Sequence, residues 1–133
     1  MKELYIEAKI ENLDTILNFL NEYIDDCTSK IKNQIAIVVD EIFSNICHYA
    51  YHPEVGDVSL RITVNGEIVL EFEDSGKPYN PLEIADPDIT ANAEDRQIGG
   101  LGIYMVKNIM DSVQYKREKQ KNILVIKKSI KNS

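Results

Sequence analysis

The sequence predicts an α+β fold, a two-layer α/β sandwich in which three helices cover one face of a mixed, mostly antiparallel sheet. Two observations predict this class. Strand-like runs occur in pairs joined by short turns, and such hairpins build antiparallel sheets. Three segments have helical periodicity instead. The chain has 133 residues, 44% of them hydrophobic, which fits a single domain spanning residues 1–133 with its own core.

The chain begins with one expected strand and one expected helix. Residues 3–10 alternate approximately between apolar and polar side chains, which indicates a strand. Asn12 can cap the following amphipathic helix. We expect that helix to end at Asp25 and Asp26, because negative charge is unfavourable at a helix C-terminus.

A second helix is expected from about Ser29 to Tyr51, where Pro53 stops it. Its apolar side chains form a broad stripe. They are Ile31, Ile35, Val38, Val39, Ile42, Phe43, Ile46, Tyr49 and Ala50. Glu41 and Asn45, one turn apart, lie together at the border of this stripe. Their oxygens suit a hard cation such as Mg²⁺, and a carboxylate can accept a proton from a nucleophile. A solvated polar face explains the pair equally well.

Residues 56–64 and 67–73 read as two strands. Asn65 and Gly66 join them, and both residue types accept the positive φ of a two-residue type I′ turn. After the second strand, residues 77–99 lose regular periodicity and contain three prolines. A loop of this length in a compact domain is either functional or disordered.

The C-terminal third predicts a helix and a last hairpin. The helix begins at Gly99-Gly100-Leu101-Gly102, and its apolar face extends to Met110. The hairpin pairs residues 113–117 with residues 123–128 around a turn at residues 119–122. No internal repeat, second domain or linker is recognisable in the sequence.

Composition excludes several classes of function. The net charge of −7 disfavours direct nucleic-acid binding, which depends on neutralising phosphates with Lys and Arg. Cys27 and Cys47 are too few for a disulfide framework and are expected to be buried thiols in a reducing compartment. The sequence has neither a signal pattern nor an apolar run long enough to cross a bilayer. We therefore expect a soluble, cytoplasmic protein without a membrane partner.

Two further motifs suit a nucleotide. Asp74 and Gly76 follow a strand, where the carboxylate can accept a hydrogen bond from a ring amine and the glycine allows a flat ligand to approach. The glycines of Gly99-Gly100-Leu101-Gly102 expose N–H groups at a partially positive helix N-terminus, which suits phosphate. Taken singly, an ordinary turn and a flexible hinge explain these two motifs as well.

In combination, the three motifs resemble a known superfamily. Glu-x-x-x-Asn on a helix, Asp-x-Gly after a strand and Gly-x-Gly at a helix start occur in this order in the GHKL ATPases, which include gyrase, Hsp90, histidine kinases and MutL. The chain is most similar to the small anti-sigma factor serine kinases of the RsbW and SpoIIAB type. The stretches that carry the resemblance are residues 40–51, 73–81 and 99–107. It implies the Bergerat ATP-binding fold over nearly the whole chain.

The resemblance implies a role for each motif residue. Asn45 would bind the Mg²⁺ that bridges the phosphates of ATP, and Glu41 would be the catalytic general base. Asp74 would accept a hydrogen bond from the adenine amine, with Gly76 beneath the base. The other implied nucleotide-binding residues are Pro78, Arg96, Gly99, Gly100, Leu101 and Gly102. Residues 77–98 would form the ATP lid, from which Arg96 would reach the γ-phosphate. Many relatives have a glycine at the position of Pro78, whereas the anti-sigma kinases often have proline there.

The function implied by the resemblance is that of an ATP- and Mg²⁺-dependent serine/threonine-protein kinase. It would phosphorylate a serine of an anti-anti-sigma protein and bind a sigma factor, and the resemblance also suggests a homodimer. Two alternatives remain open. One is a nucleotide-gated protein-binding module without kinase activity, and the other is a stand-alone ATP-binding domain of a sensor kinase system.

Overall fold

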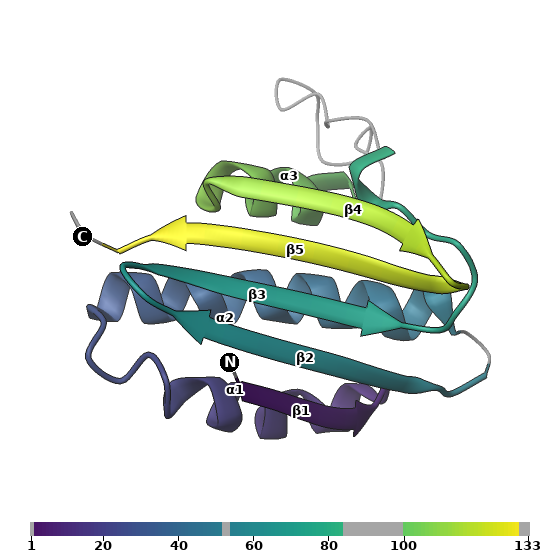
Figure 1. Cartoon of the computed structure of the whole chain (residues 1–133), viewed down its shortest axis with the longest axis horizontal. Helices are drawn as coiled ribbons and strands as arrows, with labels where there is room; N and C mark the ends of the chain where they lie inside the picture. The colour runs from purple at the N-terminus through teal and green to yellow at the C-terminus, as the bar shows by residue number, and fades with distance from the viewer. Residues whose placement is uncertain (1, 52–53, 84–99, 131–133) are drawn as a thin grey trace.

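The structure, a computed structural model, describes residues 2–51, 54–83 and 100–130, with the main chain alone at 100 and 101. The described residues form a five-stranded sheet in the order β1-β2-β3-β5-β4 (Figure 1). Each pair of neighbouring strands is antiparallel. The strands are Lys2–Glu7 (β1), Asp57–Val64 (β2), Glu67–Asp74 (β3), Ser112–Glu118 (β4) and Lys121–Ser129 (β5). This confirms the predicted α+β class.

The helices lie on one face of the sheet, behind the strands in Figure 1. The three α-helices are Leu13–Asn21 (α1), Ser29–Asn45 (α2) and Gly100–Ile109 (α3). Shorter helical segments are Ile10–Asn12 (η1, 3₁₀), Ile46–Ala50 (η2, π) and Pro81–Glu83 (η3, 3₁₀). Because only one face of the sheet is covered by helices, strand side chains alternate between buried and more exposed positions, as the pattern of β3 illustrates.

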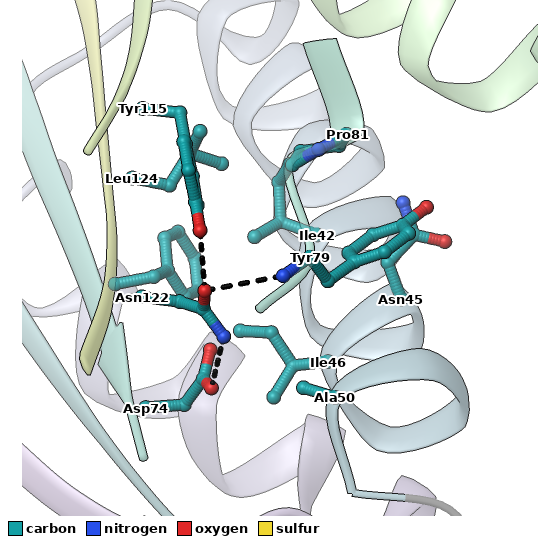
Figure 2. A pocket seen from close by; sticks show the side chains of 11 residues that line it. Ile42, Asn45, Ile46, Ala50, Asp74, Tyr79, Pro81, Tyr115, Asn122 and Leu124 are labelled. Atoms are coloured by element: carbon teal, nitrogen blue, oxygen red, sulfur yellow. Dashed lines mark hydrogen bonds between the residues drawn. The ribbon is translucent and has the colours of Figure 1, made fainter. Parts of the chain in front are cut away.

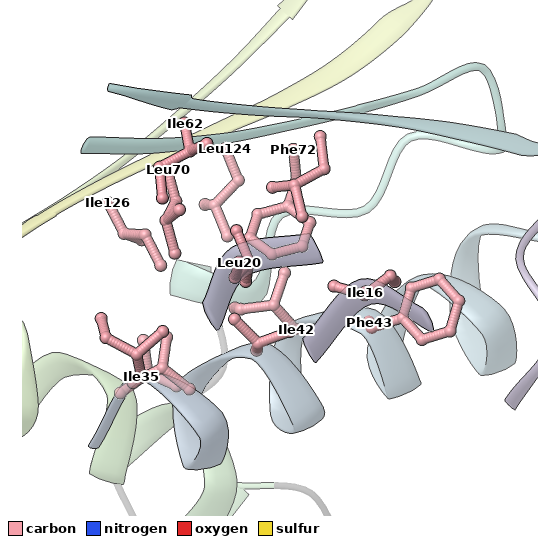
Figure 3. Close-up of a cluster of buried hydrophobic side chains, with 14 of the residues drawn as sticks. Ile16, Leu20, Ile35, Ile42, Phe43, Ile62, Leu70, Phe72, Leu124 and Ile126 are labelled. Atoms are coloured by element: carbon pink, nitrogen blue, oxygen red, sulfur yellow. The ribbon is translucent and has the colours of Figure 1, made fainter. Parts of the chain in front are cut away.

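The core is formed where the apolar stripe of α2 meets the inner face of the sheet (Figure 3). Ile42 and Phe43 of α2 are at most 2% exposed, as are Leu70 and Phe72 of β3. A helix packed this closely along its length has little freedom to rotate or slide. The polar residues at the border of the stripe are therefore held in fixed positions relative to the ends of the strands.

The last turn of the second helix differs from the prediction. After Asn45 the chain continues as a π-helix, in which the Tyr51 N–H donates to the Ile46 carbonyl at 3.3 Å. A π turn contains one more residue than an α turn, so side chains beyond Asn45 change face. Tyr49, predicted in the apolar stripe, is 45% exposed, whereas Ala50 is 2% exposed. The prediction of the helix end near Tyr51 is confirmed, but the placement of Tyr49 is wrong.

The first helix is shorter than predicted, and its start lacks the predicted side-chain cap. It ends at Asn21 rather than at Asp25 and Asp26. Beyond that point the chain remains in turns that still bury Ile24. Asn12 makes no side-chain cap, and its Nδ2 donates to the Glu7 carbonyl at 2.9 Å. The amide therefore ties the end of β1 to the helix start instead of satisfying helical N–H groups.

The turn between β2 and β3 also differs from the prediction. The strand register pairs Val64 with Ile68, so Asn65 and Gly66 do not form a two-residue loop. Gly66 has a positive φ of 72°, whereas Asn65 does not, which excludes a type I′ turn. The inward alternation of apolar residues fixes the register, and the turn must follow it.

The turn between β4 and β5 is a two-residue turn, shorter than the predicted turn at residues 119–122, because Lys121 and Asn122 belong to β5. It is formed by Lys119 and Gln120, whose φ values are 52° and 66°, between the paired residues Glu118 and Lys121. Two positive φ values are characteristic of type I′. The type I′ turn is thus found in the last hairpin rather than at the Asn-Gly pair.

Cys27 and Cys47 are free thiols, and both are partly rather than fully buried, so the prediction of buried thiols is only partly right. Burial raises the pKa of the Cys47 thiol to about 11. Within the described ranges, every helix is too short or too polar to cross a membrane.

Candidate functional site

A small cavity lies between the helical segment α2–η2 and the ends of β3 and β5 (Figure 2). The residues that line it are Ile42, Asn45, Ile46, Ala50, Phe72, Asp74, Tyr79, Pro81, Tyr115, Asn122 and Leu124. The cavity has a volume of about 20 Å³, enough for roughly one water molecule. Two residues singled out from the sequence, Asn45 and Asp74, therefore meet in one cavity although they come from different layers of the fold.

Asp74, the last residue of β3, is 5% exposed. Its Oδ1 accepts hydrogen bonds from the Gly76 N–H and from Asn122 Nδ2, both at 2.9 Å. Burial raises the pKa of the Asp74 carboxyl, and the hydrogen bonds from Asn122 and Gly76 oppose that shift. We call this group, Asp74 with Gly76, Asn122 and Tyr115, the Asp74 end of the site.

Gly76 allows the chain after β3 to pack directly against the end of η2. A Cβ at this position would meet the carbonyl group of Ala50. The next residue, Lys77, donates its N–H to the same Ala50 carbonyl at 2.9 Å. The family resemblance implies that Gly76 lies beneath the base. The structure adds that the glycine also permits a close contact between two main chains.

Asn122, predicted from the sequence only as part of a turn, is a buried polar residue in the structure. It lies at the start of β5, directly opposite Asp74, and is 5% exposed. Tyr115 OH donates to Asn122 Oδ1 at 2.5 Å (Figure 2). Strand periodicity could have identified it, because Asn122, Leu124 and Ile126 alternate on one face and the last two are core residues. A polar residue in such a row requires a partner.

Glu41, Asn45 and Gly102 form the second part of the site, which we call the Glu41 end. A Cβ on Gly102 would overlap the Glu41 carboxylate, so the first turn of α3 lies against this side chain. The N–H groups of a first helical turn have no intrahelical acceptors and carry partial positive charge. Partial burial raises the pKa of the Glu41 carboxyl, and the nearby Asn45 amide opposes that shift.

Asn45 is 8% exposed, and its Nδ2 has no hydrogen-bond partner among the residues that the structure describes. The Tyr79 hydroxyl is a second buried polar atom without such a partner. In Figure 2 the Tyr79 ring extends toward the helix that carries Asn45. The ring stacks on Tyr49 at a centroid distance of 5.0 Å, and burial raises the pKa of Tyr79 to about 12. Buried donors without acceptors are costly, so this end of the site is suited to a ligand that supplies acceptors.

The remaining predicted residues are less informative. Pro78 is exposed and does not line the cavity. Gly100 and Leu101 belong to the first turn of α3, but the structure does not describe the Leu101 side chain. Arg96 and Gly99 lie outside the described residues.

A metal ion at this site would need ligands besides the described side chains. Within residues 2–51, 54–83 and 100–130, no group of three His, Cys, Asp or Glu side chains is arranged to hold one. Mg²⁺ is commonly bound through one or two protein oxygens together with substrate phosphates and waters. The Asn45 side-chain oxygen, beside Glu41 and the start of α3, could serve as one such oxygen, whereas its unpartnered Nδ2 would suit a phosphate oxygen.

The fold and the site together define an ATPase domain of the GHKL class. Residues 6–128 match the histidine kinase-like ATPase domain, and the chain belongs to this family. This confirms the resemblance drawn from the three motifs.

Two curated relatives and one solved structure illustrate the similarity. The serine/threonine-protein kinase BtrW of Bordetella bronchiseptica is 27% identical over 77% of this chain and 73% of its own length. An anti-sigma F factor of Clostridium kluyveri is 26% identical over 74% of this chain and 70% of its own length. The blue-light activated histidine kinase of Erythrobacter litoralis has a similar fold, with a TM-score of 0.61 and 17% identity over 91% of this chain. This chain spans only 41% of that kinase.

Proposed function

We propose that the cavity between Asp74 and Asn45 is the base-binding part of an ATP site and that the protein is an ATP- and Mg²⁺-dependent serine-protein kinase. Its substrate would be a serine of an anti-anti-sigma protein, and it would also bind a sigma factor. The observation that carries the proposal is the meeting of Asp74 and Asn45 in one cavity, with Glu41 and the α3 N-terminus directly beside it.

The Asp74 end would bind adenine. The cavity wall is mostly apolar, with Ile42, Ile46, Phe72 and Leu124 around the single buried carboxylate. Such a wall suits the faces of a flat ring, and Asp74 would accept a hydrogen bond from the 6-amino group. Asp74 Oδ1 already accepts two hydrogen bonds, whereas Oδ2 makes none within the described residues and would accept this one.

The Glu41 end would bind the phosphates and the metal. The first-turn N–H groups of α3, which includes Gly100 and Gly102, would donate to phosphate oxygens. Asn45 would contribute one oxygen ligand to Mg²⁺. When bound, Mg²⁺ would neutralise charge on the phosphates. Glu41 would accept the proton of the attacking serine hydroxyl, and its raised pKa makes it a better base than an ordinary exposed glutamate.

Nucleotide binding requires this cavity to open, because about 20 Å³ cannot hold a purine. Tyr79 is the side chain best placed to move, since its hydroxyl has no partner within the described part of the chain. Its main chain is held, because the Tyr79 N–H donates to Asn122 Oδ1 at 3.2 Å. Rotation of the ring away from α2 would enlarge the cavity without displacing the strand ends.

Support for the partners comes from the relatives. One is named a serine/threonine-protein kinase and another an anti-sigma F factor. A chain similar to both is best explained as a kinase that acts within a sigma-factor circuit. The alternative is a nucleotide-gated binding module, in which movement of Tyr79 would report nucleotide to a partner without phosphate transfer.

The test combines nucleotide binding with phosphate transfer. The purified protein would be incubated with Mg²⁺, γ-labelled ATP and the anti-anti-sigma protein of the same organism. Label on a serine of the partner is the expected result. Binding of ATP without label on the partner would favour the gated module, and failure to bind ATP at all would refute the nucleotide site.

A further inference from the structure

Asn122 joins three segments that are distant in the sequence. Its Nδ2 donates to Asp74 Oδ1 at 2.9 Å and to the Lys77 carbonyl at 2.8 Å. Its Oδ1 accepts from Tyr115 OH at 2.5 Å and from the Tyr79 N–H at 3.2 Å. The side chain thus connects the end of β3, the segment that follows β3 and strand β4.

These four bonds fix the orientation of the amide. A carboxamide has two N–H groups and an oxygen with two lone pairs, and all four are used here. Rotating the amide by 180° would place its N–H groups against the Tyr79 N–H, and would place its oxygen against the Asp74 carboxylate and the Lys77 carbonyl. Each contact would then become repulsive. Asn122 can therefore act as a donor to Asp74, not as an acceptor.

Because the Asn122 amide has a fixed orientation, it also holds the Asp74 carboxylate in one orientation. Oδ1 accepts two N–H groups, from Asn122 and Gly76, whereas Oδ2 makes no hydrogen bond to the described part of the chain. A carboxylate held by two donors on one oxygen cannot rotate freely. Asp74 therefore offers one oxygen to the cavity, in one direction, and that oxygen can only accept.

We propose that Asn122 is a positioning residue that determines the base specificity of the site. By holding Oδ1 of Asp74, it presents Oδ2 to a purine with an amino group at C6 and disfavours a purine with a carbonyl there. This inference rests on the proposed nucleotide site and adds a residue, Asn122, whose action is exerted through Asp74.

The test compares ATP with ITP, whose base carries a carbonyl at C6. Affinities for both Mg²⁺ complexes would be measured by calorimetry on the full chain. Wild type is expected to prefer ATP. In Asn122→Ala the ATP affinity should fall about tenfold, whereas the ITP affinity should change by less than about threefold, because only the amine contact depends on a fixed Asp74. Asn108→Ala, which removes an exposed asparagine of α3, is the matched control and should keep the preference.

Two variants with smaller structural changes test the same inference if Asn122→Ala does not fold. Tyr115→Phe removes one bond to Asn122 and should reduce the ATP preference by about threefold. Asn122→Asp keeps the shape of the side chain but places two carboxylates together, which share a proton when one of them is protonated. Its preference for ATP should therefore decline as the pH rises from about 6 to 9, which the loss of a merely structural bond would not produce.

The outcomes separate the two proposals. If wild type binds ATP and the Asn122 variants lose ATP and ITP affinity equally, Asn122 is structural and the present inference is wrong, while the nucleotide site stands. An unchanged ATP preference in folded Asn122→Ala would also show that the inference is wrong, while the nucleotide site stands. If wild type binds neither nucleotide, the proposed function fails and the inference fails with it.

Discussion

The two ends of the site differ in how completely their polar groups are bonded. At the Asp74 end, the buried amide of Asn122 makes all four of its hydrogen bonds within the protein. At the Glu41 end, the equally buried amide of Asn45 has an Nδ2 without a partner among the described residues. Both are asparagines on the inner side of the fold, yet one is fully satisfied and the other is not.

This difference suggests that the two ends of the site bind the ligand in different ways. A fully bonded group is preorganised and can select a ligand by shape and hydrogen bonding. A buried N–H group without a partner depends on the ligand to supply an acceptor, as expected where phosphates are to bind. The surroundings of Gly76 and Gly102 differ in the same way. A side chain at Gly76 would meet main chain, whereas one at Gly102 would meet the flexible end of Glu41.

The largest expected effect tests the chemistry of the Glu41 end. Glu41→Gln should slow phosphate transfer to the partner on the order of 10²–10⁴-fold, because it removes the proposed base. ATP affinity should remain nearly unchanged. Single-turnover transfer and calorimetry would measure the two quantities separately. Asp14→Asn, at an exposed carboxylate of α1, is the control and should transfer phosphate normally. Parallel loss of binding and rate in Glu41→Gln would show that Glu41 is structural.

The second prediction concerns recognition at the Asp74 end. Asp74→Asn should weaken ATP binding by about 1–3 kcal/mol, because the ligand loses a buried charged acceptor. Calorimetry on this variant and on Asp14→Asn, which changes an exposed carboxylate on α1, would isolate the effect. An unchanged ATP affinity would refute the assignment of Asp74 to the adenine amine.

The glycines provide a direct contrast between the two ends. Gly76→Ala should lower the free energy of unfolding by about 1–3 kcal/mol, because its Cβ meets the Ala50 main chain. Gly102→Ala should be nearly neutral in stability, since alanine favours a helix by about 1 kcal/mol and Glu41 can move aside.

Displacement of Glu41 in Gly102→Ala should nevertheless slow transfer on the order of tenfold. Urea unfolding and transfer assays on both glycine variants would check this contrast. The same loss of stability in the two variants would contradict it.

The smallest effect is a pH dependence of stability. The pKa of Glu41 in the folded protein is raised by burial above its ordinary value of 4.5. A raised pKa means that the folded state binds the proton more tightly than the unfolded state does, so stability is lost as the pH rises through the folded pKa. Glu41→Gln removes this loss. Its melting temperature relative to wild type should therefore increase from pH 4 to pH 8, and a constant difference would argue against a desolvated Glu41.

Much of the fold was predictable because it depends on local patterns. The apolar stripe of α2 and the alternation in β3 both lie within single elements, and both predictions are confirmed. The errors concern competition between local and distant interactions. The Asn65-Gly66 pair favours a type I′ turn, but the register of β2 and β3 on the core overrides it.

The site was predictable as far as its motifs are contiguous. The sequence placed Glu41 and Asn45 on one face, and Asp74 two residues before Gly76. It did not identify Asn122, whose bond to Asp74 joins residues 48 positions apart. Pairing between β3 and β5 depends on the whole sheet topology, and a single sequence does not specify which residues a sheet brings face to face.

The π turn after Asn45 accommodates one more residue than an α turn would. Five residues, Ile46–Ala50, occupy the turn, so Ala50 rather than Tyr49 comes to lie beside Asn45 in the cavity wall and against Gly76. If the same residues kept ordinary α-helical phase, Tyr49 would instead come to the place where only a methyl group fits. The π turn thus allows the chain to carry one additional residue between Asn45 and Ala50 while both side chains keep their places in the cavity wall.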